Sequence, residues 1–139
     1  MNTTKNIIIP ILIFLAAATV VAILYSGDSP VLVVGDSSLT INGAGSTSYT
    51  IDYEDIQLVE LVYSPDYGTS IDGGKKRMYA YGIWYNESWG EYSLYVNTNI
   101  DVCIVITEIE GVLVFNYVNE KTTEDFYNSF LAYLEGKKN

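Results

Sequence analysis

The chain has 139 residues, enough for one folded domain, and its 17 acidic and 7 basic side chains give a formal net charge of −10. This charge argues against nucleic acid as a partner, because binding to a phosphate backbone depends on clustered cations. Histidine is absent and cysteine occurs once, which excludes imidazole catalysis, an internal disulfide framework and a metal site built from several cysteines.

The first predicted element is the uncharged apolar segment at residues 7–25, IIIPILIFLAAATVVAILY. A helix needs about 20 apolar residues to cross a bilayer, so this segment predicts a transmembrane helix between a short tail at 1–6 and a linker at 26–30. A cleaved signal peptide is the alternative, with residues 20–22 as its cleavage site. We favour the uncleaved anchor, because the apolar segment continues through residues 23–25 beyond that site.

The positive charges near this segment predict its orientation. Lys5 and the amino terminus are the basic groups beside the helix, and both lie on its N-terminal side. The positive-inside rule then places the N-terminus in the cytoplasm. We therefore expect a single-pass protein of the cell membrane, held in the bilayer through residues 7–25, with its acidic body outside the cytoplasm.

Residues 31–135 are predicted to form one mainly β domain. Alternating apolar and polar residues, interrupted by glycine, asparagine and aspartate, indicate about seven short antiparallel strands. Residues 64–74, SPDYGTSIDGG, are predicted to be a loop, because proline, glycine and aspartate are depleted in strands. The expected strands cover residues 31–42 (one strand, broken at 36–37), 49–53, 56–63, 75–85, 91–97, 101–107 and 112–118.

The last predicted element is an amphipathic helix at residues 122–135. The sequence TTED at 122–125 is typical of a helix start capped by threonine. Gly136 is expected to end the helix and to leave a tail at 136–139. Strands in hairpin order can bend into a partly open barrel, and we expect this helix to cover its open end. The apolar residues at helical spacing are Phe126, Tyr127, Phe130, Leu131 and Leu134.

Short motifs follow one another along the body: SLTI at 38–41, YEDI at 53–56, LVEL at 58–61, LYVN at 94–97, IVIT at 104–107 and VFN at 114–116. In this succession, ended by the helix, the chain resembles the bacterial pleckstrin-homology-like (PH-like) family, whose small domains often occur beside transmembrane helices. The resemblance implies a PH-like partly open barrel of about seven antiparallel strands, capped by a C-terminal α-helix. It implies no catalytic residues.

The composition of the first hairpin turn indicates which ligands the domain could bind. Phosphoinositide-binding PH domains, which this fold resembles, hold the headgroup with lysine and arginine around that turn. Here the turn is NGAGSTS at residues 42–48 and has no cation, which argues against a phosphoinositide headgroup as ligand. We interpret the two glycines within it as hairpin chemistry rather than a nucleotide fingerprint, because a third glycine and a following helix are missing.

An aromatic segment at residues 78–95, MYAYGIWYNESWGEYSLY, follows three consecutive cations at 75–77. In one interpretation its rings pack in cross-strand pairs and cover the barrel. In a second they form a surface for a protein partner or ligand, and in a third they contact the lipid interface. The candidate binding residues are Tyr79, Tyr81, Trp84, Tyr85 and Trp89.

The sequence offers no assembled catalytic or metal chemistry. Cys103 lies among β-branched residues and is expected to be a buried thiol, with no histidine to activate it. Asp66 and Asp72 lack the alternating ligands of a calcium loop. We therefore expect no catalytic residues, metal or cofactor.

The functional prediction is a membrane-anchored, non-catalytic interaction or sensing module with a protein partner. The alternative is a module that binds a small molecule or lipid at the open end of the barrel. An enzyme comes third, because no nucleophile and base pair is visible in the sequence. The interaction module requires an exposed surface, and the ligand-binding module requires a cavity. Both features depend on the three-dimensional fold.

Overall fold

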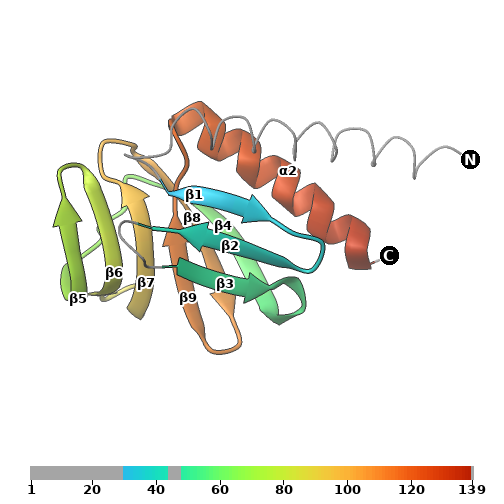
Figure 1. Ribbon diagram of the computed structural model, residues 1–139, viewed down its shortest axis with the longest axis horizontal. Helices are drawn as coiled ribbons and strands as arrows, with labels where there is room; N and C mark the ends of the chain where they lie inside the picture. Colours follow the sequence, from blue (N-terminus) through green and yellow to red (C-terminus); the bar gives the residue numbers. More distant parts are fainter. Residues whose placement is uncertain (1–29, 44–47, 139) are drawn as a thin grey trace, which may run out of the picture.

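The computed structural model describes residues 30–43 and 48–138. The expected tail at 1–6, the membrane segment at 7–25 and all of the linker at 26–30 except Pro30 lie outside these ranges. Within them, no helix combines the length and the hydrophobicity that crossing a bilayer requires. The body is mainly β, with two sheets and a C-terminal helix (Figure 1).

The smaller sheet has three antiparallel strands in the order β1-β2-β3. They are β1 (Val31–Val34), β2 (Ser38–Asn42) and β3 (Ser48–Asp52). We expected residues 31–42 to form one broken strand, but β1 and β2 pair as a hairpin. The Gly35 N–H donates to the Ser38 carbonyl at 2.8 Å, so a tight turn closes where the sequence indicated only a break. A short 3-10 helix, η1 (Tyr53–Asp55), leads from this sheet to the next.

The larger sheet has six strands in the order β4-β8-β9-β7-β6-β5. They are β4 (Ile56–Tyr63), β5 (Thr69–Lys76), β6 (Tyr79–Asn86), β7 (Gly90–Asn97), β8 (Val102–Glu108) and β9 (Gly111–Phe115). The prediction of about seven strands, all antiparallel, is therefore wrong. The described residues contain nine, and β7 runs parallel to β9.

The parallel pair arises because β9 folds back on β8 and inserts between β8 and β7. Asn116, fully buried, marks the end of the insertion. Its Nδ2 donates to the carbonyls of Asn97 and Val102, at 3.0 and 3.2 Å, and its Oδ1 accepts from the Asn97 N–H at 2.8 Å. One side chain thus satisfies the backbone groups of β7 and β8 beyond the point where β9 ends.

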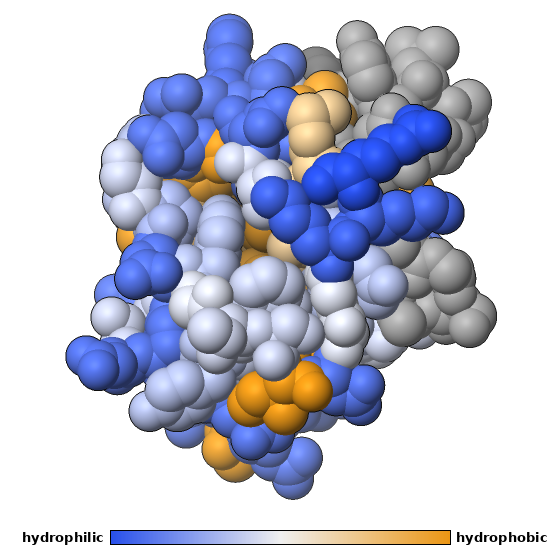
Figure 2. All heavy atoms as spheres, turned by 90° about the vertical axis from the view of Figure 1, so that its left-hand side faces the viewer, coloured by the Kyte–Doolittle hydropathy of each residue, from blue (hydrophilic) through white to orange (hydrophobic). Residues whose placement is uncertain are grey.

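The predicted loop at 64–74 is wrong in its second half, which forms most of β5. Gly73 faces Gly82 of β6, with φ values of 146° and 98°. A Cβ on Gly82 would lie 2.4 Å from the Asp72 carbonyl oxygen, so only glycine fits between the two strands at this point. The expected strand at 75–85 is accordingly the end of β5 joined to β6 by a turn at 77–78. Figure 2 shows the end of the molecule that β5 and β6 occupy.

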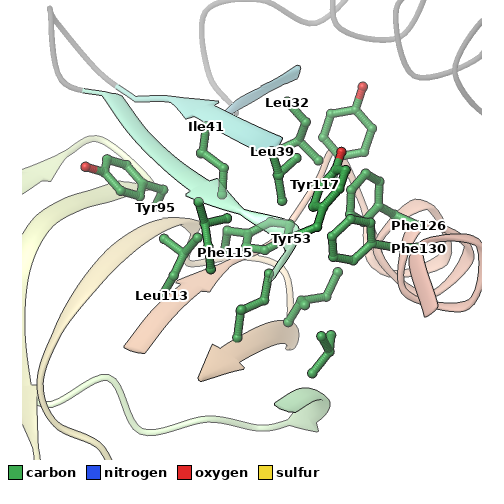
Figure 3. Close-up of a cluster of buried hydrophobic side chains, with 14 of the residues drawn as sticks. Leu32, Leu39, Ile41, Tyr53, Tyr95, Leu113, Phe115, Tyr117, Phe126 and Phe130 are labelled. Carbon is green, nitrogen blue, oxygen red and sulfur yellow. The ribbon is translucent and has the colours of Figure 1, made fainter. Parts of the chain in front are cut away.

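Helix α2 (Glu120–Lys138) covers the first hydrophobic core, which lies between the two sheets (Figure 3). Phe126 and Phe130 stack with centroids 5.5 Å apart, and Phe126 meets Phe115 of β9 edge-on at 5.8 Å. The helix is longer than the expected 122–135 and takes in most of the expected tail. The predicted threonine cap is also wrong: Asn119 Oδ1 accepts from the Thr122 N–H at 2.7 Å.

A second hydrophobic cluster lies on the opposite face of the larger sheet. Because β4 and β5 are consecutive in the chain but form opposite edges of the sheet, the connection at 64–68 runs from one edge to the other. Tyr67 in this connection packs against the cluster, and the Tyr92 hydroxyl donates to the Tyr67 carbonyl at 2.5 Å. The buried members are Ala80, Tyr92, Leu94, Val96, Cys103, Val105 and Val114.

Candidate interaction surface

The predicted aromatic site is divided between the faces of the larger sheet. Tyr79 and Tyr81 stack at 6.1 Å between centroids, and Tyr81 packs against the first core. Tyr79 is only 6% exposed, and its hydroxyl is buried with no hydrogen-bond partner in the described part of the chain. Burial raises the pKa of this hydroxyl above its usual value. Both rings therefore serve packing.

Trp84 and Trp89 pack against the second cluster. The Trp84 indole N–H donates to the Tyr81 carbonyl at 2.9 Å, and the Trp89 ring meets Tyr92 edge-on at 5.1 Å. Asn86 fixes the turn between β6 and β7, because its Oδ1 accepts from the Trp89 N–H at 2.7 Å. These contacts hold both indoles in place as half-buried side chains rather than free surface rings.

Tyr85 is the most exposed of the five predicted residues, at 48%. It lies on β6 directly opposite Thr69, at the start of β5. The five residues thus do not meet on one surface, although Tyr85 lies next to a feature that the sequence did not reveal. That feature is the outer edge of β5.

Strand β5 is the last strand of the larger sheet, and its outer edge pairs with no strand in the described residues. All of β5 except Gly74 is exposed, and Ile71 is 55% exposed. A bulge between Ser70 and Asp72 interrupts the pairing with β6. In Figure 2, hydrophobic atoms on this side appear in separate small areas among pale and hydrophilic ones. The continuous feature on this side of the molecule is therefore the backbone of β5.

The register of the β5–β6 hairpin determines which backbone groups point outward. Lys76 and Tyr79 are paired across the turn at 77–78, and Gly74 is paired with Tyr81. In an antiparallel pair, residues alternate between those that bond the partner strand and those that do not. A two-residue turn closes on a bonded pair, so the N–H and C=O of Lys75 point to the free edge.

Positive charge gathers at one end of this edge. Residues 75–77 (KKR) hold three of the seven basic residues of the chain, within an otherwise acidic protein. Asp72 lies earlier on the same strand. An extended segment with acidic residues next to the cationic end would complement this charge.

Cys103 is fully buried, as the sequence predicts, and burial raises the pKa of its thiol to about 12. A thiol with this pKa stays protonated at neutral pH and is a poor nucleophile. Across residues 30–43 and 48–138, no group of three or more acidic or cysteine side chains is placed to hold a metal ion.

No protein-family model, curated protein or solved structure matches the chain. The resemblance to the PH-like family therefore rests on the sequence motifs alone.

Proposed function

We propose that the chain is a non-catalytic interaction module that binds an extended segment of a partner protein along the free edge of β5. An added strand would bond the outward backbone groups of β5, and side chains beside the edge would select its sequence. The observation that carries this proposal is an eight-residue edge strand with almost complete exposure. Natural sheets usually shorten or cover such an edge, because it invites pairing with another chain.

The chemistry of the edge specifies the partner segment. Lys75, Lys76 and Arg77 favour acidic residues at one end of it, while Ile71 and Tyr85 offer exposed apolar contacts for the other end. The partner is thus a protein with an extended acidic segment that contains a few apolar side chains.

The membrane anchor remains part of the proposal. Residues 7–25 would hold the body at the outer side of the cell membrane, where confinement raises its effective concentration toward membrane neighbours. A PH-like partly open barrel is the finer description of the fold. A mainly β body ended by a core-covering helix supports it, while the inserted β9 and the parallel β7–β9 pair depart from the expected strand order.

The test uses the full chain in lipid nanodiscs and a displayed library of random ten-residue peptides. Peptides that bind are expected to be rich in acidic residues, and their binding should slow amide hydrogen exchange in β5. Lys75→Pro removes an outward N–H and should abolish binding, since proline is tolerated on a sheet edge but cannot donate. Lys75→Ala is the matched control, because it removes the same charge and keeps the N–H.

Binding that Lys75→Ala retains and Lys75→Pro loses supports strand addition. Equal affinity of the two variants contradicts it, as does protection of amides elsewhere in the sheets. An unchanged unfolding curve for Lys75→Pro shows that the loss of binding is not a loss of fold.

A further inference from the structure

A cavity of about 580 Å³ lies on the helix side of the molecule, away from β5. It opens between η1, the start of β4 and the last turns of α2. Asp52, Glu54 and Lys137 bring charge to its wall, and Ile56 and Leu134 bring apolar surface. Its volume falls in the range of small-molecule sites, roughly 300–1,000 Å³.

Two tyrosine rings form one corner of this region. Tyr53, which lines the cavity, and Tyr133 of α2 meet edge-on, with centroids 5.5 Å apart and planes at 78°. The Tyr53 hydroxyl donates to the Gly35 carbonyl at 2.7 Å, and the Tyr133 hydroxyl donates to the Asp36 carbonyl at 3.2 Å. Tyr53 also packs edge-on against Phe130 at 5.7 Å (Figure 3). The corner is therefore fixed by the small sheet and the core.

A cation already lies in this corner. The Lys137 ammonium is 5.7 Å from the Tyr53 ring centroid and 5.2 Å from that of Tyr133. It also donates to the Asp36 carbonyl. Two ring faces, a carbonyl oxygen and nearby carboxylates form the surroundings that favour an organic cation.

Lys137 is a displaceable occupant. It lies in the last turn of α2, where helices fray, and its side chain is exposed and flexible. The rings do not depend on Lys137 for their positions, because their hydroxyls are bonded to the turn after β1. The two rings would therefore keep their positions when Lys137 moves away, and another cation could bind between them.

We propose that this corner and its cavity bind a small molecule or lipid headgroup that carries a quaternary ammonium group, and that Lys137 occupies the site in its absence. Aromatic faces favour large, weakly hydrated cations over metal ions. The cavity volume of about 580 Å³ is large enough for the rest of such a ligand. The site is separate from the proposed partner edge on β5.

The test titrates choline against the full chain in phosphatidylglycerol nanodiscs and follows binding by calorimetry. The neutral isostere 3,3-dimethylbutan-1-ol should bind about tenfold more weakly, because it lacks the charge that the rings attract. Lys137→Ala should tighten choline binding several-fold by emptying the corner. Lys121→Ala is the matched control: it removes the same charge from an exposed position at the other end of α2 and should change nothing.

Tyr133→Phe loses the hydroxyl bond but keeps the ring and its edge-on contact with Tyr53, so it should retain binding. Tyr133→Leu should lose binding while the fold persists in an unfolding curve. Weaker choline binding in phosphatidylcholine nanodiscs would identify the lipid headgroup as the natural ligand, and equal binding would identify a soluble one. Equal affinities of the Lys137→Ala and Lys121→Ala proteins would overturn the proposal. So would equal binding of choline and its neutral isostere.

Discussion

The helix side and the β5 side of the molecule differ in what they bury. On the helix side, Phe126, Phe130 and Leu134 are buried between the sheets, and their packing fixes Tyr53. On the other side, β5 exposes nearly every side chain, and among the described residues it pairs with β6 alone. The first side holds most of the packed core, and the second has an exposed strand edge. The proposed binding edge thus lies apart from the core that α2 covers.

The largest loss of stability is expected from a substitution in the core on the helix side. Phe130→Ala removes a fully buried ring that contacts Tyr53 and Phe126, so the free energy of unfolding should fall by about 3–5 kcal/mol. Ile71→Ala on β5 should change it by less than about 0.5 kcal/mol. Urea unfolding of the full chain in detergent measures both. Similar losses for the two variants would mean that β5 also belongs to the stable core.

A smaller loss of stability is expected from a substitution where β5 and β6 approach closely, at Gly73 and Gly82. Gly82→Ala forces a side chain into a positive φ and places its Cβ 2.4 Å from the Asp72 carbonyl oxygen, so the free energy of unfolding should fall by about 2 kcal/mol. Gly111→Ala is the control, because its Cβ would meet no heavy atom within 4 Å. In the Gly82→Ala protein, amide hydrogen exchange should speed up more in β5 and β6 than in α2 and the core beneath it. Uniform acceleration would show that the two sides unfold as one unit.

The smallest effect at neutral pH concerns Cys103. Its folded pKa of about 12 exceeds its ordinary value of 9.0, so the folded state holds the proton more tightly than the unfolded state. This contribution to stability is constant below pH 9 and is lost as the pH rises toward 12. Cys103→Ala should therefore flatten the fall in stability across that window. An unchanged slope would show that the thiol reaches solvent, and rapid alkylation at pH 8 would show the same.

The sequence predicts the features that local pattern controls. Mainly β structure, the amphipathic C-terminal helix and the burial of Cys103 all follow from periodicity and composition. The sequence missed β5, because an exposed edge strand buries neither face and so carries no alternation. It also missed the insertion of β9, which depends on contacts between strands far apart in the chain.

The candidate site was harder to predict than the fold. The aromatic segment at 78–95 covers β6 and most of β7 but none of β5. Both faces of β6 are partly covered, so ring content alone could not separate packing residues from exposed ones. The signals that were available are the paired glycines at 73 and 82 and the three cations at 75–77. Together they indicate a hairpin whose two strands approach closely at the glycines and whose turn carries positive charge.

Amide hydrogen exchange in β5 shows whether a partner segment pairs with the free edge of this strand. It is measured on the full chain in nanodiscs, with and without a selected acidic peptide. We predict that the peptide slows exchange at Lys75, whose N–H points to the free edge, and leaves Gly74, which bonds β6, unchanged. Protection that spares β5, or that persists in the Lys75→Pro protein, would show that the peptide does not bind by strand addition at this edge.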